Sequence, residues 1–169
     1  MKNVWYTFLL LLLSAHFLSA QTESSSGMPE LNLHVEGSTW LAINAVSVNI
    51  EGKFYSAPTE KFHLYGRGGL AYVNVNYLNI LESYSSVGAI LALAILTGVG
   101  DHHFEAVGGA FLGNFKSQHL FVSTADDNLG FKGLPVIDLG YRYQKPGPGI
   151  FFRAKVGILG LGVGFGYGF

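Results

Sequence analysis

The sequence predicts an all-β protein: an up-and-down antiparallel transmembrane β-barrel of about eight strands, preceded by a cleaved signal peptide. Three observations carry this prediction. The chain begins with a short apolar segment, it is poor in charge and rich in glycine, and runs of alternating apolar and polar residues recur to its end. In the last run, residues 160–169, every even position is glycine and every odd position is apolar or aromatic. This period of two is typical of a strand whose faces meet different surroundings.

Composition limits the class of protein. Charged residues make up 12% of the 169 residues, about half of the usual ~25%. Glycine occurs 23 times, about twice its usual share of ~7%. A soluble domain needs charge to solvate its surface, so this balance favours a chain that faces lipid. The formal net charge of −1 gives no reason to expect a nucleic acid partner. Because there is no cysteine, disulfides and thiolate metal sites are excluded.

The first 20 residues have the three parts of a signal peptide. Lys2 supplies a positive charge, residues 4–13 are apolar except for Thr7, and small residues lead to a cleavage site after Ala20. An uncleaved membrane anchor is the alternative, but about ten apolar residues fall short of the ~20 that a spanning helix needs. Gln21 stands where a lipoprotein would have cysteine, so no lipid anchor is expected. Residues 21–29 are Ser-rich and predicted to be disordered, and residues 30–169 form the predicted barrel domain.

The first half of the barrel domain contains four predicted strands. A turn at 37–38 separates the first two, and a change of phase near Asn44 predicts a β-bulge. The fourth segment is apolar on both faces, so its periodicity fits either a strand or a short helix. The predicted strands are residues 30–36, 39–54, 62–73 and 86–97.

The second half contains the other four predicted strands, which end at the glycine-alternating run. Turns are predicted at 98–101, at 145–149, which reads Lys-Pro-Gly-Pro-Gly, and at 158–160. The predicted strands are residues 102–113, 133–144, 150–157 and 161–169.

The connections alternate in length. If the N-terminus starts in the periplasm, the short turns at 55–61, 98–101 and 145–149 fall on the periplasmic side. The long polar connections 74–85 and 114–132 then fall outside, as in known outer-membrane barrels. We expect these two connections to be the contact surfaces for an extracellular ligand or protein.

Charged side chains lie on the strand faces opposite the apolar ones. An apolar face toward lipid leaves these charges in the lumen, which in an eight-stranded barrel is just wide enough for side chains to fill. Cations and carboxylates can pair there, and the glycines of the last strand leave room for them. The sequence therefore predicts a filled cylinder and not a pore. The predicted lumen charges are Glu36, Arg67, Glu105, Asp138, Arg142, Arg153 and Lys155.

Aromatic residues are predicted to form girdles at both edges of the lipid band. They are Trp40, Tyr65, Tyr72, Tyr141, Tyr143, Phe152, Tyr167 and Phe169.

The C-terminus resembles the signal that outer-membrane barrels present to the barrel assembly machinery, with Gly164, Tyr167 and Phe169 in its glycine and aromatic places. Gly162 stands where a polar residue is usual. The segments 100–105 and 140–154 resemble a group of small uncharacterised outer-membrane barrel proteins of Gram-negative bacteria with OmpA/OmpX-type eight-stranded architecture. The resemblance implies an outer-membrane location, the lipid bilayer and the assembly machinery as partners, and no particular activity.

Residues for catalysis or for a cofactor are not found in a productive pattern. His102, His103 and Glu105 have metal-ligand chemistry, but neighbouring strand residues point to opposite faces, so at most two could share a metal. Residues 126–128 lack the spacing of a calcium loop, and no nucleophile elbow or phosphate loop is present. We therefore expect a non-enzymatic barrel without cofactor or metal, with a structural or surface-interaction role. The alternatives are a small transporter or channel and a soluble secreted β-sandwich or ligand-binding protein.

Overall fold

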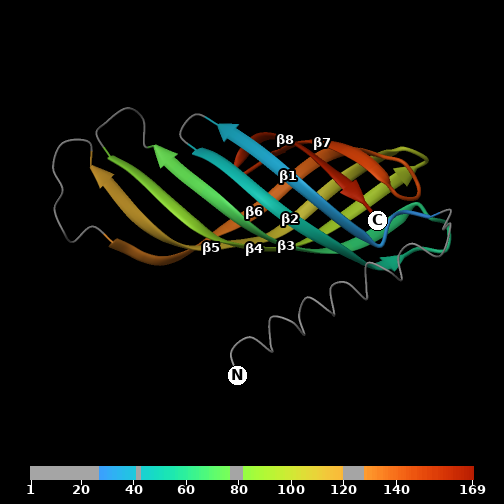
Figure 1. Ribbon diagram of the computed structural model, residues 1–169, viewed down its shortest axis with the longest axis horizontal. Coiled ribbons are helices and arrows are strands. Elements are labelled where there is room, and N and C mark those ends of the chain that lie inside the picture. The colour runs from blue at the N-terminus through green and yellow to red at the C-terminus, as the bar shows by residue number, and fades with distance from the viewer. Residues whose placement is uncertain (1–26, 41–42, 77–81, 120–127) are drawn as a thin grey trace, which may run out of the picture.

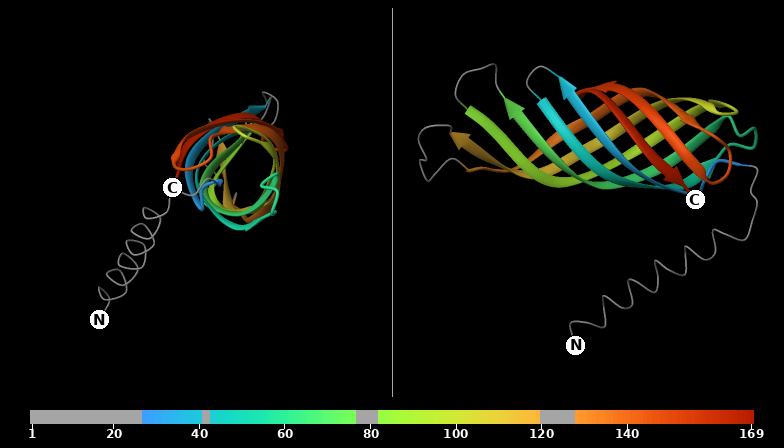
Figure 2. Two further views of the ribbon diagram at one scale, coloured as in Figure 1. Left: turned by 90° about the vertical axis from the view of Figure 1, so that its right-hand side faces the viewer. Right: turned by 45° about the horizontal axis from the view of Figure 1, so that its top comes forward.

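The computed structural model describes residues 27–40, 43–76, 82–119 and 128–169. These form a closed barrel of eight strands in which each strand pairs antiparallel with its neighbours in the chain. β1 pairs with β8 to close the ring, and Figure 2 (left) shows that ring along its axis. The strands are β1 (Leu31–Trp40), β2 (Ile43–Ser56), β3 (Phe62–Asn76), β4 (Glu82–Val99), β5 (His102–His119), β6 (Asn128–Gln144), β7 (Gly149–Gly157) and β8 (Gly160–Gly168).

The predicted all-β, eight-stranded antiparallel barrel is confirmed, and the ring is a single closed sheet, unlike the two sheets of a sandwich. The signal peptide predicted for residues 1–20 lies outside the described residues. Within the described part of the chain, no helix has the length and apolar character to cross a membrane.

The turn predicted at 37–38 is wrong. Gly37 pairs with Val46 of β2 and Val163 of β8, so β1 continues to Trp40. The bulge expected near Asn44 is also absent, because β2 begins only at Ile43 and its alternation runs unbroken from there. The register of β2 shifts instead between Lys53 and Tyr55. Glycine and serine are common in turns, but here backbone pairing on both sides holds them in the ladder.

The apolar segment 86–97 is part of strand β4, which settles the choice between strand and helix. Its alternate side chains point in opposite directions: Val87 and Leu91 are exposed on the outer surface, whereas Ile90 and Leu96 are buried inside. The lumen face of the segment is small or apolar throughout: Ile90 packs in a hydrophobic cluster, whereas Ala92 stands opposite Arg67 and Leu96 opposite Glu105.

The long connections are shorter than predicted, because their polar ends belong to strands. β3 runs to Asn76 and β4 begins at Glu82; β5 runs to His119 and β6 begins at Asn128. The ladder between β4 and β5 reaches His119, opposite Glu82. What remains of the connections, 77–81 and 120–127, lies outside the described residues.

The barrel wall is uneven in height. β4, β5 and β6 have 17 or 18 residues, whereas β7 and β8 have nine each. β6 pairs with β7 only from Asp138 onward, so its residues 128–137 extend beyond the end of β7. In Figure 1 these long strands reach farthest at the left end of the barrel. We call the part of β4, β5 and β6 beyond β7 the tall wall.

The two mouths of the barrel differ. The turn-side mouth has the connections 57–61, 100–101 and 145–148, the start of β1 and the end of β8. Gly100 and Gly147 have φ of 68° and 80° there, a left-handed conformation that favours glycine. The loop-side mouth has the ends of β1, β3, β5 and β7 and the starts of β2, β4, β6 and β8.

Candidate functional site: the ionic layer of the lumen

The side chains of the barrel are distributed inside out. Large apolar residues face outward on all eight strands, and the buried charged side chains, which come from six of them, face the lumen. Val48 and Ile50, for example, are 51% and 43% exposed, whereas Asn49 and Glu51 between them are at most 1% exposed. A water-soluble sheet would show the reverse pattern.

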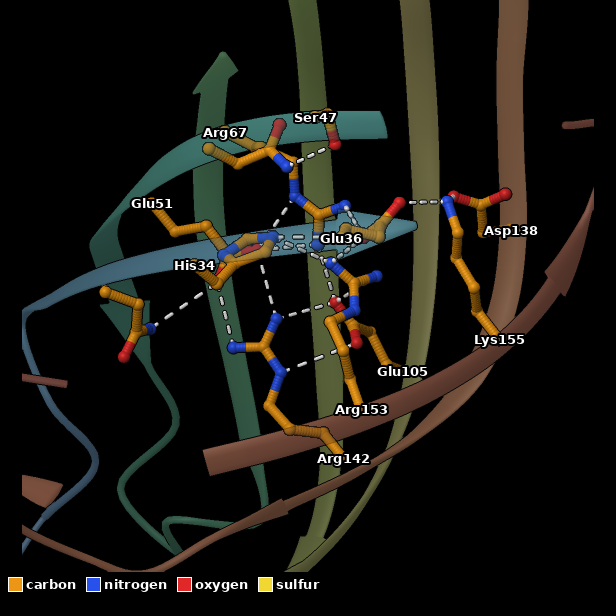
Figure 3. A network of polar contacts seen from close by, with 12 residues as sticks. His34, Glu36, Ser47, Glu51, Arg67, Glu105, Asp138, Arg142, Arg153 and Lys155 are labelled. Carbon is orange, nitrogen blue, oxygen red and sulfur yellow. Dashed lines mark hydrogen bonds and ion pairs between the residues drawn. The ribbon is translucent and has the colours of Figure 1, made fainter. Parts of the chain in front are cut away.

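The seven predicted lumen charges are all buried inside the barrel. They come from five strands and meet at one level of the lumen, together with Glu51 of β2 (Figure 3). We call these eight residues the ionic layer. Its four carboxylates and four cations have formal charges that sum to zero. Its members are Glu36, Glu51, Arg67, Glu105, Asp138, Arg142, Arg153 and Lys155.

Arg142 lies at the centre of the ionic layer and is fully buried. Its Nη1 donates to Glu51 Oε2 at 2.8 Å and its Nη2 donates to Glu105 Oε1 at 2.7 Å. The guanidinium also lies 4.9 Å from the ring centroid of Phe151 and 5.9 Å from that of Tyr65. Two carboxylates and two aromatic faces therefore hold this cation, an arrangement that suits the planar guanidinium of arginine.

Arg67 bridges the same two carboxylates from the opposite side of the lumen. Its Nε donates to Glu51 Oε1 at 2.8 Å, and its Nη2 donates to Glu105 Oε1 at 2.7 Å. Glu51 on β2 and Glu105 on β5 are thus joined through two guanidinium groups. The side chains tie together strands that are not neighbours in the sheet.

The remaining members form a second group beside the first. Arg153 Nη1 lies 2.8 Å from Glu36 Oε2 and its Nη2 lies 3.2 Å from Glu105 Oε1, so it links the two groups. Lys155 Nζ lies 2.8 Å from Asp138 Oδ2 and also pairs with Glu36. Removing one partner of such a buried pair typically costs about 3–5 kcal/mol, because a charge is left uncompensated.

Glycines on β8 make room for the ionic layer. Gly164 stands opposite both Glu36 and Arg153 in the ladder. A Cβ added at Gly164 would lie 3.0 Å from Arg153 Cγ, and one at Gly162 would lie 2.8 Å from Lys155 Cε. The glycine face of the last strand therefore points into the lumen, where neighbouring cations fill the space.

Toward the loop-side mouth the lumen is filled by apolar side chains, which we call the apolar layer. These side chains are at most 7% exposed and pack into one cluster: Ala45, Val73, Ile90, Phe111, Val136 and Leu159. Where the two layers meet, a cavity of about 10 Å³ is lined by polar groups such as Asn49 and Asp138 and by Ile90. That volume is about what one water molecule needs.

The residues of the predicted assembly signal lie at the end of β8. Gly164 faces the lumen, whereas Tyr167 is 43% exposed on the outer surface. The rings of Tyr167 and Phe169 are 4.9 Å apart. Of the predicted girdle aromatics, Tyr65 is placed differently: it is fully buried in the lumen and contacts Arg142.

The candidate metal ligands are engaged in other contacts. His102 Nδ1 lies 2.5 Å from the hydroxyl of Tyr141 on the outer surface. His103 faces the lumen with its Nε2 3.3 Å from the carbonyl oxygen of Gln144, and Glu105 belongs to the ionic layer. Among the described residues, no group of three His, Asp or Glu side chains could hold a metal ion. Residues 126 and 127 lie outside the described part.

Sequence reasoning omitted Glu51 from the predicted lumen charges. The signal for it was present, because Ser47, Asn49 and Glu51 alternate with apolar residues on one strand. In the structure all three are buried on the lumen face, and Glu51 accepts hydrogen bonds from two arginines. Its contacts with Arg67 and Arg142 join residues 16 and 91 positions apart, so only the folded barrel shows its role.

Comparisons of the chain with protein-family models, with curated proteins and with solved structures found no match.

Proposed function

We propose that the chain is an integral outer-membrane β-barrel of a Gram-negative bacterium, with a non-enzymatic structural or surface-interaction role. The observation that carries this proposal is the inside-out distribution of side chains. Between the two mouths, the described Asp, Glu, Lys and Arg side chains belong to the ionic layer, and the outer surface there is apolar. The lipid bilayer is the proposed partner of this apolar surface, which we call the belt.

Physical chemistry supports this assignment. The largest apolar patch on a typical soluble monomer covers about 300–600 Å², whereas the exposed apolar residues of the belt come from all eight strands. In hydrocarbon each backbone polar group needs a partner within the protein, and a closed barrel provides one. The same belt in water would favour aggregation.

The proposed orientation puts the turn-side mouth in the periplasm and the loop-side mouth outside, following the lengths of the connections. Residues 1–20 are the proposed signal peptide, and the C-terminal Gly164, Tyr167 and Phe169 are proposed to address the chain to the barrel assembly machinery. Deleting Phe169 should reduce the amount of folded barrel in the outer membrane.

A closed lumen supports a structural or interaction role over that of a channel or transporter. The ionic layer and the apolar layer fill the interior, and the cavity between them has room for about one water molecule. We expect no conductance steps when the barrel is inserted into planar lipid bilayers. Regular steps would instead support the channel alternative.

The proposed contact surface is the tall wall together with the predicted outer connections 74–85 and 114–132. Along β6 residues 128–136, no described strand pairs on the side that faces β7. Such an edge can accept an extended segment of a partner protein as an additional strand. Pro135, which has no N–H, lies in this stretch, as is usual for an edge strand.

Membrane fractionation tests the proposal. The full chain, expressed in a Gram-negative host, should stay in the outer-membrane pellet after carbonate or urea washing, and the unheated protein should run as a heat-modifiable band. Recovery of the protein in the washed supernatant would contradict the proposal.

A variant of the belt gives a second test. Leu93 is 53% exposed on β4, and Leu93→Arg should destabilise a barrel folded in lipid vesicles by up to about 2–4 kcal/mol. Leu93→Ala is the matched control and should cost much less. A soluble barrel would tolerate the arginine, so an equal urea midpoint for both variants would count against a lipid-facing belt.

A further inference from the structure

Residues 27–30 precede β1 and lie in the turn-side mouth, although they belong to no strand. Met28 is 3% exposed and Pro29 is also buried. These residues include the end of the segment 21–29 that was predicted to be disordered; the rest of that segment lies outside the described residues. A methionine that lies outside every strand is buried only if the segment around it makes specific contacts with the barrel, because an unattached segment would leave its side chain in solvent.

Three consecutive carbonyl oxygens of this segment accept hydrogen bonds from three different parts of the barrel. The backbone N–H of Gly147 donates to Gly27 O at 2.9 Å, in the turn between β6 and β7. Lys53 Nζ donates to Met28 O at 2.5 Å, and the buried hydroxyl of Tyr65 donates to Pro29 O at 2.9 Å. These donors lie on β2, on β3 and in the β6–β7 turn, so the segment spans the mouth.

The segment also contacts the strand that closes the barrel. The N–H of Glu30 donates at 3.1 Å to the carbonyl oxygen of Phe169, which directly follows β8, and the N–H of Phe169 donates at 2.8 Å to the carbonyl oxygen of Leu31, the first residue of β1. A Cβ added at Gly168 would lie only 2.6 Å from Cγ of Pro29. The segment can therefore take this position only with β8 in place and with glycine at position 168.

We propose that residues 27–30 are a plug that seals the turn-side mouth, with a seat that is complete only when β8 has closed the barrel against β1. The plug covers Tyr65, whose ring contacts Arg142 at the centre of the ionic layer. It thus shields that layer from water and locks the β1–β8 seam. Every contact that carries this inference is within the chain, so it stands independently of the proposed membrane location.

Oxidation of the native methionine tests the plug without any substitution. The chain has two methionines, Met1 and Met28, and mass spectrometry of peptides distinguishes them. Because oxidation follows exposure, hydrogen peroxide should oxidise Met28 roughly tenfold or more slowly in the refolded full chain than in the urea-unfolded chain. Equal rates in the two states would overturn the proposal.

A pair of glycine variants tests the coupling to the closing strand. Gly168→Ala should displace Pro29 and speed the oxidation of Met28 in a barrel that still shows its gel shift. Gly149→Ala is the matched control. Gly149 of β7 pairs with Gly168 of β8, and a Cβ added at Gly149 meets nothing within 4 Å. Met28 should remain protected in that control.

A second pair of variants keeps the proposal open to refutation if Gly168→Ala does not fold. Removing the two side-chain donors with Tyr65→Phe and Lys53→Met should increase the oxidation rate of Met28 severalfold. Tyr72→Phe, on the outer face of β3, is the control and should leave that rate unchanged. Full protection of Met28 in a folded barrel that lacks both donors would contradict a plug held by this seat.

Discussion

The ionic layer and the apolar layer fill the same lumen in different ways. Across the ionic layer, long side chains from six strands reach one another, and each charge has a named partner at 2.6–3.2 Å. In the apolar layer, side chains such as Ile90 and Val136 pack in one hydrophobic cluster. Dispersion contacts are individually weak and tolerate small changes of shape, whereas a buried charge depends on its specific partner.

The two layers differ because β4 and β8, which provide no charged side chain to the lumen, contribute residues of different size at the two levels. β8 contributes glycine and β4 contributes alanine at the level of the ionic layer: Gly164 stands opposite Glu36, and Ala92 stands opposite Arg67. Small residues on two strands leave the volume that the arginine side chains occupy. In the apolar layer β4 instead contributes Ile90, which fills the lumen itself. Charged side chains as large as arginine therefore fit in this narrow lumen only where neighbouring strands contribute small residues.

Reversing a charge should have the largest effect. Arg153→Glu would place a third carboxylate beside Glu36 and Glu105, where the present cation lies 2.8 Å and 3.2 Å from them. We expect the heat-modifiable band to be lost in detergent. Arg153→Lys, which keeps a cation, should retain that band. An unchanged gel shift for the glutamate variant would mean that position 153 does not face the lumen.

Removing the central cation should have the next largest effect. Arg142→Met keeps most of the volume but leaves Glu51 and Glu105 with fewer partners, and should cost about 3–5 kcal/mol of unfolding free energy. Urea titration of the barrel in detergent measures this cost. The double variant with Glu51→Gln should recover part of the loss. If the two changes simply add, the carboxylate and the guanidinium are not coupled.

Filling the space at the last strand should have an intermediate effect. Gly164→Ala places a Cβ 2.9 Å from the carbonyl oxygen of Val35 on β1 and 3.0 Å from Arg153 Cγ, and overpacking of this kind typically costs about 1–3 kcal/mol. Gly68→Ala is the control, since an added Cβ there meets nothing within 4 Å. The difference between the two urea midpoints measures how tightly β8 is packed against β1 and the ionic layer at Gly164. Equal midpoints would show that both Arg153 and the backbone at Val35 can move aside.

A small change in the apolar layer should have the smallest effect. Ile90→Val removes one methylene group from a side chain that is 6% exposed and should cost about 0.5–1.5 kcal/mol. The same urea titration applies. A cost as large as that of Arg142→Met would mean that the apolar layer is as intolerant of change as the ionic layer, and the contrast between them would fail.

Particular residues show how far the sequence could go. Alternation at Leu33, Val35, Val48 and Ile50 predicted strands and their faces, because side chains of a strand point alternately to opposite sides. Alternation failed at Gly37 and Ser38, whose ladder partners on β2 and β8 are distant in the chain. Alternation could not distinguish a strand from a short helix at residues 86–97, where both faces are apolar. It also missed that β4, β5 and β6 continue through polar residues, because backbone pairing does not require apolar side chains.

By itself, the sequence determined the class of fold, the approximate number of strands and the face on which most charges lie, since a period of two is a local property of the chain. Only the tertiary structure decided which charges meet. Arg142 reaches Glu51 across 91 positions in the chain, and the carbonyl oxygens of Met28 and Pro29 accept hydrogen bonds from Lys53 and Tyr65. Such contacts depend on the register of eight strands around a closed ring, and no local pattern encodes that register.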